Sequence, residues 1–534
     1  MSTASVPNPT MTSWLRVLWS QVLFPGAAPD DCRPRIGAIL ILLVLPAALL
    51  YPSLGFHLFE PDEGRYAQIP REMLARGDWV VPHLQGEPYL DKPPLLYWLV
   101  MVSYSIFGAA DWSARLAPAL AVHAAILVLY LVGRRSVGER PAFWGALLLA
   151  LAPGFLSVGR LLVLDGLLAF LVTTALLCAL EALRTDRLRW SWWLVSALAC
   201  GLGVLTKGPI SLILLAPPLL AYRWLSAPAW KLPRGAILAY LAVVVLTPLP
   251  WYVAMSLRVP GFLTEFFWKH NVVRFLSPFD HLEPVWFYAP ILLAGLLPGT
   301  LLLVPAFRFL LTADADQARQ RPPALGFLLL AGLWCVLFFS LSGCKLATYV
   351  LPAFPPLALA LGCALTARGW QQSRWTLTAC TGAFAFLFSV HQVMLPWYAE
   401  FRSPYGEESD IARLAGDPET PVVCYPRSCD SLAFYLNRSD FQSFRSKETP
   451  ELVQFLRTRP RTVVLFTHRH SLNSLRLHLP ANELKVADEI PLYDSARAGV
   501  EGFKYLLNQS PLGDGSRDSK AGLCYAAVIE QVGR

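Results

Sequence analysis

Carboxylates and cations crowd the segment from Phe59 to Lys92, which lies between two strongly apolar stretches of the chain. Asp62 and Glu63 stand near its start, and Asp91 directly precedes Lys92 at its end. Charges beside hydrocarbon are costly unless they are solvated or paired, so such a cluster at a membrane surface is typical of a functional site. A carboxylate there can take a proton from a hydroxyl, and a lysine can bind a phosphate.

Further polar residues interrupt the apolar boundaries later in the chain. They are Asp165 in VLDGLLAF, Lys207 in TKGP, Arg274 in FFWKHNVVRF, and Lys345 and Tyr349 in SGCKLATYVLP. Arginine can grip a phosphate through two N–H groups, and lysine acts as a compact point charge. We therefore expect these cations to hold an anionic headgroup. The alternative is that each long basic side chain only reaches water from a helix end.

Two of the acids also have a structural interpretation. Asp62 precedes the helix-like sequence EGRYAQIPREMLARG and could be its N-cap, and Asp165 could cap the next apolar helix. In the functional interpretation, Asp165 pairs with Arg160 or with a cation of the site. Lys92 precedes two prolines, which disfavour helix in the residue before them, so it suits a rigid phosphate ligand or a simple break between segments.

The composition is that of a membrane protein. Of 534 residues, 55% are hydrophobic and 15% are charged, whereas a soluble protein has about 25% charged residues. The excess of 45 Lys+Arg over 37 Asp+Glu is explained by basic cytoplasmic loops rather than by a nucleic-acid partner. Because the sequence contains neither a P-loop nor a Gly-rich dinucleotide turn, it argues against a soluble nucleotide substrate. No cofactor is required by the sequence.

About eleven apolar stretches reach the length that a membrane-spanning helix needs. They are 36–53, 114–133, 141–159, 166–183, 190–206, 209–225, 236–256, 285–307, 324–342, 350–367 and 376–396. The stretch 94–107 is apolar but short. If it is re-entrant or interfacial, the basic loops, such as the one with Arg134 and Arg135, all fall on the cytoplasmic side, as does the N-terminal segment 1–35.

This topology places the unusual charges on the outer face, which predicts an extracytoplasmic active site. The membrane domain covers 36–396, and its first outer loop covers 54–113. From 397 to 534 the composition changes, and short strand-like segments (TPVVCY, RTVVLFT) alternate with helical ones (SLAFYL, ETPELVQFLRTR). We predict a soluble α/β domain there, on the outer side. Whether Cys424 and Cys429 form a disulfide in it stays open.

The run PDEGRYAQIPREMLARGDWVVPHLQGEPYLDKPPLLYW resembles the first extracytoplasmic loop of the aminoarabinose transferase (ArnT) family. The pieces VLDGLLAF, GVLTKGPISL, FFWKHNVVRF, PVWFYAPILLAGLLPG and SGCKLATYVLPAFP also match, in order, over most of 36–370. The family consists of bacterial inner-membrane enzymes related to protein O-mannosyltransferases. The resemblance implies an all-α polytopic membrane bundle of GT-C type with interfacial helices, followed here by the α/β domain. The tail shows no match, and family members commonly carry more spans before it.

The resemblance further implies transfer of a sugar from undecaprenyl phosphate to a lipid or protein acceptor on the periplasmic face. By motif position, the residues that would hold the donor phosphate are Tyr89, Lys92, Arg274 and Tyr349, with Lys207 and Lys345 in less defined roles. Asp62 would be the central carboxylate, with Glu63 beside it and Asp165 across the cavity. A hydroxyl acceptor needs a base, whereas a lipid phosphate needs only positioning. The family also implies a divalent metal near the first loop, for which the sequence identifies no ligands beyond the nearby Asp91.

Two classes of function compete. The first is a glycosyltransferase that uses a polyprenyl-phosphate-linked sugar, with lipid A as the leading acceptor; a sister enzyme that glycosylates a protein or another glycan is the close alternative. The second is a lipid-phosphate transporter or flippase, which should show inverted repeats and charges on both sides. The sequence shows neither, so it favours an enzyme of the bacterial inner membrane, in contact with membrane lipids.

Overall fold

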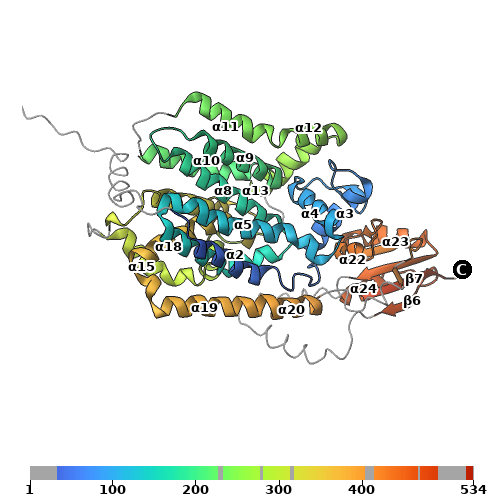
Figure 1. The fold of residues 1–534 in the computed structure, drawn as a ribbon. Helices are drawn as coiled ribbons and strands as arrows, with labels where there is room; N and C mark the ends of the chain where they lie inside the picture. The colour runs from blue at the N-terminus through green and yellow to red at the C-terminus, as the bar shows by residue number, and fades with distance from the viewer. Residues whose placement is uncertain are drawn as a thin grey trace, which may run out of the picture. The chain divides into compact units, whose positions relative to one another are not determined.

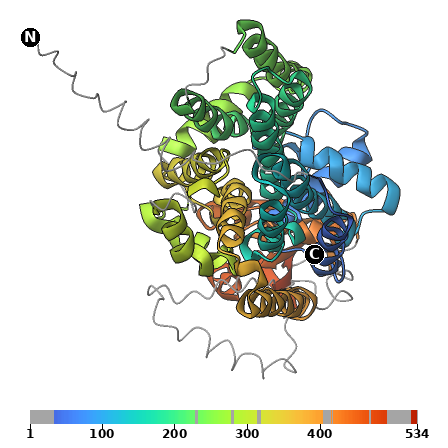
Figure 2. The same cartoon turned by 60° about the vertical axis from the view of Figure 1, so that its left-hand side comes forward.

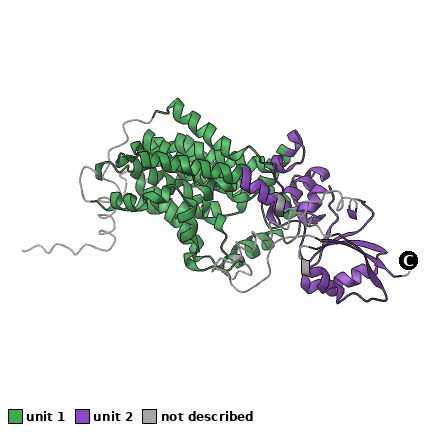
Figure 3. Ribbon diagram, turned by 90° about the horizontal axis from the view of Figure 1, so that it is seen from below, with its two compact units in different colours: residues 1–54, 90–103, 115–392 green, residues 55–89, 104–114, 393–534 purple. Residues whose placement is uncertain are grey.

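The structure, a computed structural model, describes residues 33–226, 232–276, 281–312, 318–402, 414–415, 417–466, 469–490 and 525–532. Most of the predicted N-terminal segment 1–35 therefore lies outside the described residues. The chain divides into two compact units (Figure 3). Unit 1 contains residues 1–54, 90–103 and 115–392, and unit 2 contains residues 55–89, 104–114 and 393–534.

Unit 1 is a bundle of apolar helices. Its helices are α2 (Ile36–Leu50), α4 (Leu95–Phe107), α5 (Asp111–Val137), α6 (Glu139–Ala150), α7 (Pro153–Leu156), α8 (Leu164–Leu183), α9 (Trp190–Lys207), α10 (Ile210–Ser226), α11 (Arg234–Leu246), α12 (Leu249–Arg258), α13 (Arg274–Leu276), α14 (Tyr288–Gly295), α15 (Leu303–Leu311), α17 (Leu325–Leu341), α18 (Phe354–Ala367) and α19 (Arg374–Ser389). Both views of the fold show α8, α9 and α10 side by side (Figures 1 and 2). α4 and α5 each have one end in unit 2.

Short 3₁₀-helical and π-helical segments join these α-helices. The 3₁₀ segments are Ser157–Arg160, Val285–Phe287, Gly299–Leu302, Ala347–Ala353 and Trp370–Gln372, and the π-helical segments are Thr264–Val273 and Val390–Met394. π-helical turns are rare and occur frequently at functional sites. The π-helical segment Thr264–Val273 covers most of the sequence FFWKHNVVRF.

Five helices in the described residues are long and apolar enough to cross a membrane, or up to seven if each of two bent pairs is one span. Four shorter apolar helices coincide with predicted spans or with 94–107; they are Ile36–Leu50, Leu95–Phe107, Ile210–Ser226 and Leu325–Leu341. The number of spans and the interfacial position of 94–107 therefore stay predictions.

Two of the predicted spans are broken, and the breaks pack against each other. The pair Glu139–Ala150 and Pro153–Arg160 is bent by 65°, and the pair Val285–Gly295 and Gly299–Leu311 by 100°. A Cβ atom added to Gly154, just after the first break, would lie only 2.7 Å from Cα of Gly295, just before the second. Glycine at both positions is therefore what allows the two backbones to approach so closely.

Unit 2 joins the first outer loop to the tail. It contains α3 (Asp62–Arg76), the hairpin β1 (His83–Leu84) and β2 (Glu87–Pro88), and from the tail α20 (Leu395–Arg402), β3 (Val422–Tyr425), α22 (Asp430–Tyr435), β4 (Gln442–Ser443), α23 (Thr449–Arg457), β5 (Arg461–Phe466), α24 (Arg469–Arg476), β6 (Leu484–Ile490) and β7 (Tyr525–Gln531). The five-stranded sheet has the order β4-β3-β5-β7-β6; β3 is parallel to β4 and β5, and β7 is antiparallel to β5 and β6.

The tail sheet is buried on both faces. Val463 pairs with Val422 on one side and with Val528 on the other, and all three belong to one hydrophobic cluster. The next residue along β5, Val464, belongs to the opposite cluster because successive side chains alternate across a strand. The apolar runs of the predicted strands 420–425 and 461–467 thus form β3 and β5. Cys424 and Cys429 are both buried and unbridged.

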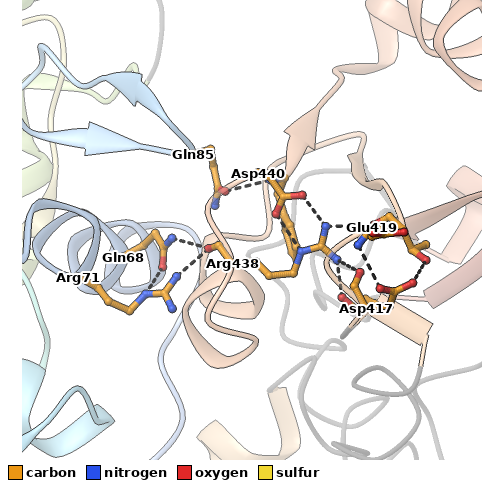
Figure 4. Close-up of polar contacts among 10 residues, drawn as sticks. Gln68, Arg71, Gln85, Asp417, Glu419, Arg438 and Asp440 are labelled. Carbon is orange, nitrogen blue, oxygen red and sulfur yellow. Dashed lines mark hydrogen bonds and ion pairs between the residues drawn. The ribbon is translucent and has the colours of Figure 1, made fainter. Parts of the chain in front are cut away.

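A hydrogen-bond network connects α3 to the tail (Figure 4). Gln68 Nε2 and Arg71 Nη2 both donate to the Arg438 carbonyl, at 2.8 and 2.7 Å. The Arg438 guanidinium in turn donates to the carbonyls of Ala415 and Asp417, at 2.7 and 2.9 Å. Arg438 is buried, so its polar groups need these partners. Through Arg438 the bonds connect α3 with the backbone at residues 415 and 417. α3 is therefore an integral part of unit 2 rather than a free loop.

Candidate functional site

Asp165 and Lys207 meet at one end of unit 1. Asp165 is the second residue of α8, whose N-cap is Val163, and Lys207 is the last residue of α9. Lys207 Nζ donates to Asp165 Oδ1 at 2.5 Å, and it also lies 4.3 Å from the centre of the Tyr349 ring. Asp165 therefore does not cap α8, and of the pairings that the sequence leaves open it makes the one with a site cation.

A pocket of about 100 Å³ opens beside this pair. Its lining consists of Asp91, Lys92, Lys207, Ile210, Phe266, His270, Asn271, Phe275, Phe339, Ser342, Cys344 and Tyr349. Three of the predicted phosphate-binding residues, Lys92, Lys207 and Tyr349, thus share one cavity although they are far apart in the sequence. All of its lining belongs to unit 1.

The turn after α9 shapes one wall of the pocket. Gly208 has φ = +80°, a conformation that side chains with a Cβ rarely adopt. A Cβ atom there would also lie 3.0 Å from the Phe266 ring and 3.3 Å from Asn271 Oδ1. Gly208 therefore lets the end of α9 approach the π-helical segment Thr264–Val273 closely.

Lys92 enters the pocket from the stretch before α4. It is partly buried, and its Nζ donates to the carbonyl of Asp91 at 3.2 Å. His270 also lines the pocket, and its Nε2 lies 3.0 Å from Asp91 Oδ1 and 3.6 Å from Glu265 Oε1. The pocket therefore holds two lysines, and the Asp165 carboxylate is paired with one of them, Lys207.

The same three residues bear on the expected metal. His270 contacts both Asp91 and Glu265. The described residues nevertheless contain no group of three or more His, Cys, Asp or Glu arranged to hold a metal ion. These residues of the described part of the chain therefore do not fit a metal site.

Two predicted phosphate ligands in unit 1 are not placed in the pocket. Lys345 is buried and donates to the carbonyls of Glu283 and Ser342, at 2.8 and 2.6 Å, and it is absent from the pocket lining. It therefore stabilises the backbone around it. Arg274 begins α13, next to the π-helical segment, but its side chain lies outside the described residues.

The remaining predicted residues belong to unit 2. Asp62 is the first residue of α3, after Pro61 at the N-cap, so the interpretation of Asp62 as the N-cap is wrong. Its side chain is 55% exposed and lies 4.0 Å from Arg65. Arg65 lies 5.9 Å from the centre of the Tyr89 ring, so this arginine links the acid to the predicted donor-binding tyrosine.

Glu63 differs from its neighbour. Its side chain is buried, and Oε2 accepts a hydrogen bond from the Phe59 backbone N–H at 2.9 Å. This bond ties the first turn of α3 to the backbone that precedes the helix. Glu63 therefore has a structural contact, whereas Asp62 remains open to solvent.

An apolar groove of about 540 Å³ lies on unit 1 close to the pocket in sequence and space. It is lined by Val204, Pro209, Leu212, Val244, Val245, Pro248, Leu249, Tyr252, Val253, Ser256, Leu257, Leu263 and Phe267. Pro209 is two residues from Lys207, and Phe267 follows Phe266, which lines the pocket. A pocket lined by two lysines beside an apolar groove suits a ligand with an anionic head and a hydrocarbon chain.

Sequence reasoning missed His270, Asn271 and the aromatic wall formed by Phe266 and Phe275. The segment FFWKHNVVRF contains all four, but only its arginine was assigned a role. Nothing in the sequence predicts the π-helical turn that directs His270 toward Asp91, since such turns have no simple periodicity.

The chain is similar in sequence and fold to known proteins. Residues 91–252 match the family model described as dolichyl-phosphate-mannose-protein mannosyltransferase. A crystal structure of ArnT from Cupriavidus metallidurans bound to undecaprenyl phosphate superposes with a TM-score of 0.70 and 22% identity, over 85% of this chain and 96% of that one. The chain is similar to ArnT and shares its fold.

Sequence relatives support the same conclusion over a shorter range. The ArnT-like chain is 38% identical over 335 residues to undecaprenyl phosphate-alpha-4-amino-4-deoxy-L-arabinose arabinosyl transferase 1 of Sodalis glossinidius, and 37% identical over 352 residues to transferase 2 of Pseudomonas fluorescens. These matches cover 61% and 64% of this chain, and the chain spans 58% of the length of each relative. The resemblance predicted from the first outer loop is confirmed, as is a multi-pass membrane protein.

Proposed function

We propose that this ArnT-like chain is a membrane glycosyltransferase that moves a sugar from undecaprenyl phosphate to lipid A. The single observation that carries the proposal is the pocket with Lys92, Lys207 and Tyr349 beside the apolar groove. A polyprenyl-phosphate-linked sugar has the complementary parts, an anionic phosphate and a long hydrocarbon chain. The ArnT relatives, whose names specify 4-amino-4-deoxy-L-arabinose, favour that pentose over a hexose.

The chemistry needs little from the protein beyond placement and charge. An acceptor oxygen attacks the anomeric carbon, the bond from that carbon to the phosphate oxygen breaks, and undecaprenyl phosphate leaves with one more negative charge. Lys92 and Lys207 stabilise that charge as it develops. Asp165 keeps Lys207 in place, and the Tyr349 ring lies against the same ammonium group.

Asp62 is assigned to the acceptor. Its exposed carboxylate takes the proton if the acceptor is a hydroxyl, and it only orients the acceptor if this is a lipid phosphate, which is already anionic. We place the N-terminus on the cytoplasmic side of the bacterial inner membrane, and the first outer loop and the tail domain on the periplasmic side.

A second candidate is transfer to a protein or another glycan, as in the mannosyltransferases whose family model matches residues 91–252. The deciding experiment is transfer by the purified protein in nanodiscs from undecaprenyl-phosphate-linked aminoarabinose to lipid A, followed by mass spectrometry of the lipid. We expect a lipid A product that carries the added pentose. Donor turnover that depends on a protein acceptor, with unmodified lipid A, would favour the second candidate. No consumption of donor would reject both.

A further inference from the structure

Three arginines surround one buried glutamate at the end of α8 opposite to the pocket. Glu181 has no exposed surface, and its carboxylate accepts hydrogen bonds from Arg135 Nε and Arg184 Nε, each at 2.8 Å, and from Arg189 Nη1. The arginines come from α5 and from the loop between α8 and α9. We call Arg135, Arg184, Arg189 and Glu181 the arginine cage.

The cage lies at the other membrane surface from the pocket. Asp165 and Glu181 are both on α8, 16 positions apart, which corresponds to about 24 Å along a helix. This is most of the thickness of a hydrocarbon core, about 30 Å. In the predicted topology the cage faces the cytoplasm.

The cage carries a surplus of positive charge. Three guanidinium groups share one carboxylate, which leaves a net charge of two. Each arginine side chain is about one-third exposed, whereas Glu181 is fully enclosed. The carboxylate therefore holds the three arginines together while their outer edges stay accessible to an anion.

An apolar face continues from the cage toward the membrane centre. Trp190, which follows Arg189 directly, is 46% exposed, and Leu194 and Leu198 on the same face of α9 are 39% and 47% exposed. Trp192 lies on the other side of α9, and the Arg135 guanidinium carbon is 5.3 Å from the centre of the Trp192 ring. Exposed tryptophan at the level of headgroups, with leucines below it, is typical of a surface that contacts lipid.

We propose that the arginine cage binds the phosphate headgroup of an anionic phospholipid, whose acyl chains lie along Trp190, Leu194 and Leu198. Basic pockets between transmembrane helices bind such headgroups, and each basic residue near an anionic surface contributes about fivefold to affinity. Guanidinium groups match phosphate oxygens in geometry as well as charge. The bound lipid would tie α5, α8 and α9 together at the end away from the transfer site.

The test compares lipids of different charge on the full-length protein. Thermal melting is measured in detergent micelles with added phosphatidylglycerol or with the same amount of phosphatidylcholine. Native mass spectrometry of the same samples counts the retained phospholipid. For the wild type we expect a higher melting temperature with phosphatidylglycerol, and retention of that lipid over phosphatidylcholine. Equal melting and equal retention with the two lipids would overturn the proposal.

Two variants separate the cage from general surface charge. Arg184→Gln combined with Arg189→Gln should lower the apparent affinity for phosphatidylglycerol by about twentyfold or more and remove its effect on melting. Arg184→Gln alone changes an exposed position and should lower the apparent affinity for phosphatidylglycerol by about fivefold. This single variant replaces the double variant in the test if the double variant does not fold. Arg187→Gln is the matched control, because Arg187 is exposed in the same loop and is not among the arginines that bind Glu181. An equal loss in the control would assign the effect to general charge and reject the cage.

Discussion

Lys207 Nζ lies 2.5 Å from Asp165 Oδ1, although 41 residues separate the two in the chain. The bond joins the end of α9 to the start of α8 and fixes the ammonium group at the wall of the pocket. A charge-assisted hydrogen bond of this kind contributes about 1.5–3 kcal/mol. The pair is therefore both a link between two helices and the means by which a cation is oriented for a phosphate.

Replacing either member of this pair should impair transfer. We expect Lys207→Ala to lower kcat/KM for the polyprenyl-phosphate sugar by about tenfold to a hundredfold, since a charge-assisted contact to phosphate is lost. Asp165→Asn should have a smaller effect, because the lysine remains but is no longer held by a charge. Steady-state kinetics in nanodiscs measure both. Lys269→Ala is the control, because Lys269 is on the neighbouring π-helical segment, is 54% exposed and does not line the pocket. Wild-type kinetics for Lys207→Ala would contradict the assignment.

Lys345 should behave differently from the pocket lysines. Its ammonium group donates to two backbone carbonyls, and an unsatisfied buried acceptor costs about 1–3 kcal/mol. We expect Lys345→Met to lower the melting temperature and to leave KM for the donor close to that of the wild type. Lys92→Met should do the reverse, raising KM with little change in melting. A raised KM with unchanged melting for Lys345→Met would restore the phosphate role that its motif implies.

These two lysines show what the sequence can and cannot predict. Lys207 and Lys345 both stand at apolar boundaries in matching motifs, and the pattern assigns both to the phosphate. The backbone decides between them: the 3₁₀ segment that holds Tyr349 begins at Ala347, so Lys345 precedes it and bonds to neighbouring carbonyls. Side-chain direction over two residues of irregular backbone is not encoded in hydropathy.

Some larger features of the fold could be predicted from the sequence, and others could not. The membrane bundle, the strands β3 and β5 and the convergence of Lys92 with Lys207 and Tyr349 are predictable, because apolar runs and motifs mark them. The breaks after Ala150 and after Gly295 interrupt the predicted spans 141–159 and 285–307, although Pro-Gly pairs at 153–154 and 298–299 signal a break. The assembly of the first outer loop with the tail was not predicted, since its contacts join residues more than 350 positions apart.

The contact between Gly154 and Gly295 should not tolerate a methyl group. Because the added Cβ would lie 2.7 Å from a backbone atom, Gly154→Ala forces the two bent spans apart, at a cost of about 1–3 kcal/mol. We expect a lower melting temperature in detergent. Gly37→Ala is the matched control, since a Cβ at Gly37 meets nothing within 4 Å and alanine favours the helix. A variant at position 154 that melts like the control would show that the two breaks separate easily.

Glu60 should make the stability of unit 2 depend on pH. Burial, helped by the nearby Asp430 carboxylate, raises the pKa of Glu60 to about 8 from its ordinary value of 4.5. Its Oε1 accepts from the Ser431 backbone N–H at 2.5 Å, so it belongs to the junction of loop and tail. Because the folded pKa lies above the unfolded one, the folded state binds more protons between these values. Stability should therefore fall as the pH rises from about 4.5 to about 8, and it should be flat above.

Glu60→Gln should remove this dependence, because an amide keeps the acceptor oxygen and does not ionise. Melting of the full-length protein between pH 5 and pH 9 measures the slope, and limited proteolysis of the tail reports whether unit 2 is the part that loosens. Glu87→Gln changes an exposed carboxylate of the same loop and should leave the slope as in the wild type. If Glu60→Gln and the wild type lose stability in parallel across this range, the proton is bound elsewhere, and the buried carboxylate at the loop–tail junction is ionised at neutral pH.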